Sequence, residues 1–314
     1  MEEALYSHLG FFNTDQVRSD KEGDFLTSPE VSKYFGKIIR NWINSKSNLK
    51  NIIEIGSGTG SLIEQIGIKE ITAVELSSTA REELIKKGID THTTIDELTT
   101  KTSDLIFGNE ILDNIPCSIG LYKDEGWYEK VVLLEENSLA YGLRPIRNEE
   151  LDWINKNNIV PNEDYEFEIQ VNIDKFLNSV IKKINPGKIL LFDYGYEQKN
   201  RDKRMYSSLL RTYKNHHLSV DPIDDPGNID ITYDVNFSSI SSELKYLGYD
   251  VTLKLQRDFL LDNGFNIFFD ELQEKYIAAE GIEKLKINSE LNGMKAIVDS
   301  NGLGGFYCLI AEKL

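Results

Sequence analysis

Three glycines and one glutamate have the types and spacing of a nucleotide site. Gly56, Gly58 and Gly60 are separated by single residues, follow an apolar run over 52–55 and precede a helix-like segment. Glu75 ends the next apolar run, about twenty positions after the glycines. Glycine lets the backbone turn sharply and approach a ligand, and a carboxylate at that strand end can accept both hydroxyl hydrogens of a ribose. The pattern predicts a strand–loop–helix–strand unit that binds a nucleotide-like cofactor.

The residue before the glycines narrows the choice of cofactor. Glu54 lies two residues before Gly56, so the loop reads E-x-G-x-G-x-G and not G-x-G-x-x-G. The dinucleotide spacing places a pyrophosphate at a helix N-terminus. The tighter loop is typical of S-adenosylmethionine (SAM) sites, where it packs against the amino-acid end of a cofactor without phosphate. We therefore expect SAM, with S-adenosylhomocysteine as its product. An NAD enzyme and a glycine-rich turn that binds nothing are the alternatives.

Carboxylates follow two later apolar runs. Glu110 and Asp113 come after the run over 104–107, and Asp193 ends the run over 188–192. Ligands of open parallel sheets bind beyond the carboxyl ends of the strands, so we expect these side chains, with Asn109, to face the site. By the same reasoning Ile95, after a short strand over 92–94, should lie beside an adenine. Carboxylates that only complement a helix dipole are the alternative.

The elements that must position these residues alternate between strand and helix. Apolar runs predict about seven strands with helices between them, a doubly wound α/β sheet of Rossmann-like type. Ser28 and Pro29 predict the cap and first turn of an N-terminal helix. A hairpin is expected from strands over 127–134 and 138–143, followed by helices over 151–157 and 173–184. Another helical stretch over 259–280 precedes the last strand, over 305–311.

These elements divide the chain into three parts. We predict an N-terminal helical lid over 1–50 and a SAM-binding domain over 51–117 and 186–314. The range 118–185 interrupts the strand–helix alternation and is predicted to be an inserted α+β substrate region. The segment over 197–237 has little periodicity, and a long irregular run in a compact chain is usually functional or disordered. We expect an ordered substrate loop there, which contains Arg211, Tyr213, His216, Asp230 and Thr232.

Composition excludes several classes of function. A net charge of -17 disfavours sequence-independent nucleic-acid binding, which needs clustered Lys and Arg, and suits solubility or a basic partner. No apolar run is long enough to span a membrane, and the first residues lack the pattern of a signal peptide. Two distant cysteines indicate a reducing compartment, so we expect a cytoplasmic protein. The four histidines form no metal site, and the oligomeric state stays open, a homodimer included.

Blocks of residues through most of the chain resemble the MidA family of SAM-dependent methyltransferases. Their order and spacing carry the resemblance more than any single block. The sequence departs from the family at Asp234 and Asn236, where a histidine and an aspartate are usual, and it is shorter than typical members. The matching blocks are Gly23-Asp24-Phe25, Thr27-Ser28-Pro29-Glu30, the glycine loop with Glu54, Asn109-Glu110 with Asp113 and Pro116, Asp193-Tyr194-Gly195, Arg211-x-Tyr213 with His216, Pro226-Gly227 and Asp230-Ile231-Thr232.

The resemblance implies an arginine methyltransferase. Mitochondrial members of the family methylate an arginine on a respiratory complex I subunit and support assembly of that complex. A guanidinium stays charged and needs carboxylates to orient it. We expect Glu110 in that role, assisted by Asp113 or Asp193, and a lid of Gly23, Asp24 and Thr27 over the cofactor. The acceptor would be a protein or peptide that presents arginine. Another peptide or small-molecule acceptor, and a non-catalytic assembly factor that binds SAM, stay open.

Overall fold

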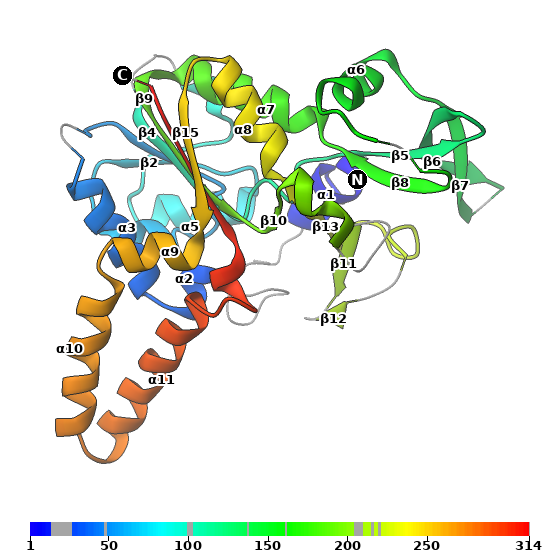
Figure 1. The fold of residues 1–314 in the computed structure, drawn as a ribbon. Helices are drawn as coiled ribbons and strands as arrows, with labels where there is room; N and C mark the ends of the chain where they lie inside the picture. Colours follow the sequence, from blue (N-terminus) through cyan, green and yellow to red (C-terminus); the bar gives the residue numbers. More distant parts are fainter. Residues whose placement is uncertain are drawn as a thin grey trace.

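A seven-stranded sheet forms the centre of the computed structural model (Figure 1). The strand order is β15-β16-β9-β4-β1-β2-β3. β16 runs antiparallel to both of its neighbours, and the other adjacent strands are parallel. The predicted doubly wound α/β sheet is confirmed. Its strands are β1 (Ile52–Ile55), β2 (Ile71–Val74), β3 (Thr91–His92), β4 (Ser103–Asn109), β9 (Ile184–Asp193), β15 (Asp250–Leu255) and β16 (Tyr307–Glu312).

The structure describes residues 1–13, 27–46, 49–98, 103–136, 138–160, 162–203, 210–214, 217–218 and 221–313. Within these ranges, none of the helices is long and apolar enough to cross a membrane.

Helices cover both faces of the sheet because successive strand residues point to opposite sides. Ile52 and Phe107 pack in one core with α3 (Tyr34–Asn44), α4 (Ser61–Ile66) and α9 (Gln256–Asp262). Ile53 and Ile106 pack in the other core with α7 (Val171–Lys183) and α8 (Phe237–Tyr246). α5 (Ser78–Lys86) connects β2 to β3. The sheet is therefore buried on both faces, and its strand ends carry the loops that face ligands.

The N-terminal helix differs from its prediction. The cap is Thr27 and not Ser28: the Thr27 hydroxyl and N–H both bond the Glu30 carboxylate, in a capping box. Helix α2 (Ser28–Val31) then stops at Ser32, whose backbone is extended, and α3 begins two residues later. Before them lie α1 (Glu2–Tyr6) and a 3₁₀ turn, η1 (Phe11–Asn13). The start of α2 lies at the ends of the strands, where the Ser28 N–H donates to the Glu110 carboxylate.

The inserted region is built on a second sheet, with strand order β7-β6-β5-β8. The predicted hairpin agrees with β6 (Gly126–Glu135) and β7 (Ser138–Pro145), but the flanking strands β5 (Ser118–Lys123) and β8 (Tyr165–Ile169) were not predicted. Their polar and aromatic residues hide the alternation on which strand prediction depends. The predicted second helix of this region, α7, packs on the central sheet.

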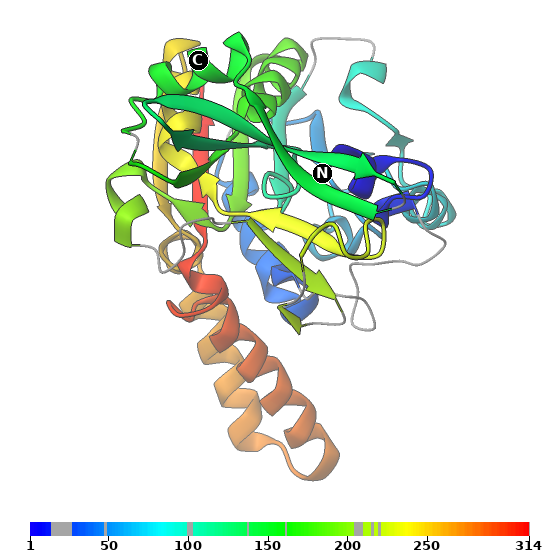
Figure 2. The ribbon, with the colours of Figure 1, turned by 90° about the vertical axis from the view of Figure 1, so that its right-hand side faces the viewer.

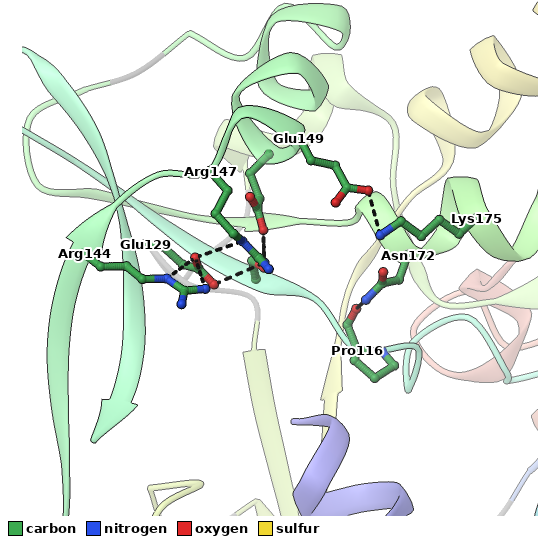
Figure 3. A network of polar contacts seen from close by, with 9 residues as sticks. Pro116, Glu129, Arg144, Arg147, Glu149, Asn172 and Lys175 are labelled. Atoms are coloured by element: carbon green, nitrogen blue, oxygen red, sulfur yellow. Dashed lines mark hydrogen bonds and ion pairs between the residues drawn. The ribbon is translucent and has the colours of Figure 1, made fainter. Parts of the chain in front are cut away.

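Ion pairs hold helix α6 (Asn148–Lys156) on this second sheet (Figure 3). Arg144 and Arg147 both contact the buried Glu129 carboxylate, and Arg147 also pairs with Glu150 at the start of α6. Lys175 of α7 contacts Glu149 at 2.6 Å. The network therefore joins the second sheet, through α6, to a helix of the central domain.

Two helices form an arm that projects from the body (Figures 1 and 2). They are α10 (Phe265–Ala278) and α11 (Gly281–Ile297). Gly264, with φ +104°, caps α10 and separates it from α9, so the predicted helix over 259–280 is two helices. The second helix of the arm, α11, was not predicted. Its base packs on α2, where a Cβ on Gly293 would lie 2.5 Å from the Val31 carbonyl oxygen.

The predicted substrate loop contains short strands. β11 (Leu210–Lys214) pairs with β12 (His217–Leu218) and β13 (Asp230–Tyr233), and β10 (Gly195–Tyr196) pairs with β14 (Val235–Asn236). These pairings place the polar residues of the segment beside the end of β9. Three further 3₁₀ turns are η2 (Ile95–Glu97), η3 (Gln198–Lys203) and η4 (Leu303–Gly305).

Candidate active site

The glycine loop between β1 and α4 turns through left-handed conformations. The φ angles of Gly56, Gly58 and Gly60 are +68°, +51° and +86°, which side chains with a Cβ rarely adopt. A Cβ on Gly56 would lie 2.3 Å from Ile111, so this glycine also allows the next loop to approach. Gly60 caps α4 and packs near Leu84, and it does not line the cavity beside the loop.

Glu75 is fixed by two backbone donors. Its Oε2 accepts a hydrogen bond of 2.9 Å from the Gly58 N–H, and its Oε1 accepts one of 2.8 Å from the Ser77 N–H. Each carboxylate oxygen can accept a second hydrogen bond. Burial raises the pKa of Glu75, although both backbone donors oppose that shift. The carboxylate is thus held against the glycine loop with acceptor capacity towards the cavity.

A cavity of about 260 Å³ lies along this loop. The buried Glu54 side chain lines it, and its Oε2 has no hydrogen-bond partner among the described residues. Tyr6 and Phe12 also line it, with their rings stacked 5.5 Å apart. The cavity is also lined by several residues that the sequence predicted and by apolar side chains. The predicted residues are Thr27, Gly56, Gly58, Glu75, Asn109 and Glu110, and the apolar ones are Leu76, Ile111 and Phe176. We call this space the cofactor cavity.

Glu110 stands at the far wall of the cofactor cavity. It follows β4 with φ +54°, a left-handed conformation uncommon for a residue with a side chain, and its N–H bonds the Phe192 carbonyl at 2.8 Å. Its Oε1 accepts hydrogen bonds from the Ser28 N–H and the Asn109 amide, at 3.2 and 2.9 Å. Burial, reinforced by the Asp113 charge, raises the pKa of Glu110 to about 8. The start of α2 therefore positions this carboxylate.

Asp113 and Asp193 occupy different places behind Glu110. Asp113 accepts a hydrogen bond from the Tyr194 hydroxyl, and its Oδ1 is buried with no hydrogen-bond partner in the described part of the chain. Burial raises the pKa of Asp113 to about 6. Asp193 accepts from the N–H groups of Leu112, Asp113 and Tyr194. It lines neither cavity, and its carboxylate holds the loop that carries Asp113; the expectation that it assists the acceptor stays a prediction.

A second cavity, of about 450 Å³, opens on the other side of Glu110. Arg211 lines it: the guanidinium lies 4.8 Å from the centre of the Tyr194 ring and pairs with Asp234. Asp230 accepts a 2.9 Å hydrogen bond from the Asn114 amide. We call this space the acceptor cavity. Its described lining includes Glu110, Asp113, Asn114, Tyr194, Arg211, Tyr213, Asp230, Thr232, Asp234 and Phe306.

The two cavities share a wall. Glu110 and Asn114 line both of them. Four carboxylates line the acceptor cavity, those of Glu110, Asp113, Asp230 and Asp234, against one cationic side chain among its described residues, Arg211. A cationic group in the acceptor cavity would therefore meet carboxylates at the boundary with the cofactor cavity.

The structure brings most of the predicted site residues together. Gly23, Asp24 and His216 lie outside the described residues. Ile95 packs in the core with Ile53 and Val74 and lines neither cavity, because the turn η2 directs its side chain inward. The sequence prediction did not name Tyr6, Phe12, Leu76, Asn114, Tyr194 or Asp234 among its site residues, although it noted the departure from the family at Asp234. Leu76, Asn114 and Tyr194 adjoin the predicted Glu75, Asp113 and Asp193, and that proximity was the available signal.

Comparisons with known proteins agree with this architecture. The model of a family of S-adenosyl-L-methionine-dependent methyltransferases matches residues 34–252. A mitochondrial protein arginine methyltransferase NDUFAF7 homolog from Caenorhabditis elegans is 25% identical over 308 residues, which cover 83% of this chain and 70% of that protein. Its Danio rerio counterpart is 25% identical over 322 residues, covering 85% and 72%.

A solved structure shares the fold. A COG1565 superfamily member from Burkholderia thailandensis, bound to S-adenosyl-homocysteine, superposes with a TM-score of 0.87 and 22% sequence identity, over 99% of this chain and 86% of that chain. The resemblance to the MidA family is confirmed by the family match, which spans most of the chain. The chain belongs to this MidA-like family of S-adenosyl-L-methionine-dependent methyltransferases.

Proposed function

We propose that this methyltransferase transfers the methyl group of SAM to a side-chain nitrogen of arginine in a protein or peptide. The observation that carries the proposal is the position of Glu110, whose side chain lines the cofactor cavity and the carboxylate-rich acceptor cavity at once. A planar cation is the acceptor that such a wall suits best, because carboxylates bind a guanidinium through paired, charge-assisted hydrogen bonds.

The cofactor cavity offers a donor set that fits SAM. The unpartnered Oε2 of Glu54 can accept from the ammonium of the amino-acid end, and Glu75 can accept from the ribose hydroxyls. The left-handed glycines leave room for close approach. Leu76 and Phe176 give an apolar wall for a planar base. When bound, the cofactor would supply an electrophilic methyl group on its sulfonium: the acceptor nitrogen would form the bond to that carbon as the sulfur–carbon bond breaks, with S-adenosylhomocysteine as the leaving group.

The residues of the shared wall then align the acceptor. Glu110 would hold the guanidinium by one edge and localise its positive charge away from the attacking nitrogen. That nitrogen loses a proton as it gains the methyl group, and Asp113 would take it: the support is that its Oδ1 has no hydrogen-bond partner among the described residues and that burial raises its pKa to about 6. The hydrogen bond from Tyr194 holds Asp113 in that orientation. Alignment and exclusion of water are the main tasks of the protein in such a displacement.

The names of the relatives support an arginine acceptor. The curated proteins from Caenorhabditis elegans and Danio rerio are named protein arginine methyltransferases. At 25% identity the acceptor of this chain can differ from theirs. Asp234 and Asn236 depart from the family pattern. Asp234 lines the acceptor cavity and pairs with Arg211, whereas Asn236 caps α8.

A second candidate has its own observation. Arg211 places a guanidinium in the acceptor cavity, and a carboxylate-bearing small molecule or peptide would find a partner there. Such an acceptor would compete with Asp234 for the same cation. The second candidate is therefore a SAM enzyme that acts on an acidic acceptor.

One experiment separates these candidates. Purified protein and methyl-labelled SAM are added to a lysate that lacks the native protein, and the labelled material is hydrolysed to identify the modified residue. Methylarginine in a discrete protein band is the expected result. Label in a small molecule or at another residue would replace the acceptor and keep the enzyme. No label with the wild type, while SAM still binds by calorimetry, would favour a non-catalytic assembly role.

A further inference from the structure

Strands β6 and β7 continue beyond the sheet that supports them. β5 pairs with β6 only as far as Lys130, whereas β6 and β7 pair with each other from Tyr128–Pro145 to Glu135–Ser138. We call residues 130–135 and 138–143 the β6–β7 ribbon. A two-stranded ribbon without a third strand or a packed face is only marginally stable in water. The ribbon therefore has the geometry of an element that gains stability from a partner.

One face of the ribbon is exposed and apolar except for Lys130, which is opposite Leu143 and pairs with Glu166. Cross-strand pairs place Val132 opposite Tyr141 and Leu134 opposite Leu139, and Leu143 follows two residues on along the same face. Between 37% and 74% of each of these side chains is exposed. The Tyr141 hydroxyl donates to Asp221, and the Lys130 ammonium lies 4.5 Å from the centre of the Tyr141 ring, so Tyr141 is held in place on this face.

The ribbon part of β7, residues 138–143, carries no charge; Arg144, the next residue, is paired with Glu129. Residues 138–143 read Ser-Leu-Ala-Tyr-Gly-Leu in a chain of net charge -17. In the described part of the chain, the backbone of these residues pairs only with β6. Edge strands are usually protected by charged residues, proline or a covering element. A basic or acidic partner would find no complementary charge on this edge, so its occupant should be an uncharged strand.

We propose that the β7 edge binds the β7 edge of a second copy of this chain, so that the two four-stranded sheets join into one. An antiparallel strand centred on Tyr141 is complementary to itself, because a two-fold axis places Leu139 opposite Leu143 of the second copy. The two apolar ribbon faces then become continuous, and no like charges face each other along the strands. Pairing of this extent is smaller than a standard interface, so we expect a dissociation constant on the order of micromolar.

Sedimentation of the full chain over a wide concentration range tests the dimer. The wild type should approach twice the mass of one chain as concentration rises. The double variant Leu139→Lys with Leu143→Lys should remain monomeric, because the lysine at position 139 of each copy would face the lysine at position 143 of the other. A control, Ile282→Lys with Leu285→Lys, replaces apolar residues of α11 that are more exposed, 74% and 71% against 37% and 48%, and should still dimerise. All of them should keep the wild-type melting temperature and SAM affinity, since the changed side chains are exposed.

A cross-link tests the register independently. Residues directly opposite each other in an antiparallel pair have Cα atoms about 4.5–5.5 Å apart, within the range of a disulfide. Tyr141→Cys should therefore form a disulfide-linked dimer under mild oxidation, and Ile282→Cys should not. A wild type that stays monomeric at every concentration would overturn the proposal. So would a dimer that persists in the Leu139→Lys, Leu143→Lys variant, or a cross-link at position 282 and not at 141.

Discussion

The cofactor cavity and the acceptor cavity meet at Glu110 but are built in different ways. The cofactor cavity takes Glu54, its glycines and Glu75 from one continuous unit, β1 to the end of β2 with the glycine loop, where backbone angles and backbone hydrogen bonds fix the geometry. The acceptor cavity is assembled from segments near residues 110, 194, 211, 230 and 300, held by contacts between side chains. The geometry of the cofactor cavity thus depends on backbone conformation, and that of the acceptor cavity depends on interactions between charged side chains. Variants of the two should fail in different measurements.

Glu110→Gln is expected to have the largest effect, and to affect methyl transfer without affecting SAM binding. A neutral amide keeps the volume and one acceptor oxygen but cannot localise the charge of a guanidinium, so methyl transfer should fall by roughly 10²–10⁴-fold. SAM affinity by calorimetry should change little, because Glu54, the glycine loop and Glu75 are untouched. Glu274→Gln, on the projecting helix α10, is the matched control and should behave as wild type. Turnover that survives Glu110→Gln would remove Glu110 from the mechanism.

The converse effect is expected from Gly58→Val. The φ of +51° at this position is strained for a β-branched residue, and the new side chain would stand beside Glu75 and the cavity. SAM affinity should fall by about a hundredfold or more. Gly88→Val is the control: its φ is +74°, but nothing lies within 4 Å of its Cβ position. That variant should lose stability and keep SAM affinity. Normal calorimetric affinity of Gly58→Val would show that the loop does not contact the cofactor.

The same contrast explains what could be predicted from the sequence. The central sheet, the glycine loop and Glu75 follow from short-range patterns, because apolar runs, glycines and strand ends lie within about thirty residues of one another. Asn114 and Asp234 could not be placed, since their roles arise from contacts with Asp230 and Arg211, and the Asn114–Asp230 contact spans 116 positions. Asp193 was placed at the right strand end, but its backbone hydrogen bonds, which hold the loop that carries Asp113, are visible only in the structure.

The charge balance of the acceptor cavity should also be visible in stability. The raised pKa of Glu110, about 8 against about 4.3 in an unfolded chain, means that the folded state binds more protons between these values. The free energy of unfolding of the SAM-free protein should therefore decrease as pH rises from 5 to 8. Glu110→Gln lacks this term, so the unfolding free energy of the variant minus that of the wild type should increase by roughly 3–4 kcal/mol between pH 5 and pH 8. Denaturant titrations at both pH values measure it; a constant difference would contradict the shifted pKa.

The smallest effect, and the one that discriminates best between acceptors, is expected from Asp234→Asn. The change leaves the volume of the side chain but removes the charge that neutralises Arg211, whose side chain is 26% exposed. An unneutralised guanidinium would repel a cationic acceptor, so the KM for an arginine-bearing acceptor identified by labelling should rise about tenfold, by about 1.4 kcal/mol. SAM affinity should not change. For an acidic acceptor the sign reverses, because Arg211 would be released to bind it and KM would fall. Since the cofactor cavity is unaffected in either case, the direction of the change in KM reports the charge of the acceptor alone.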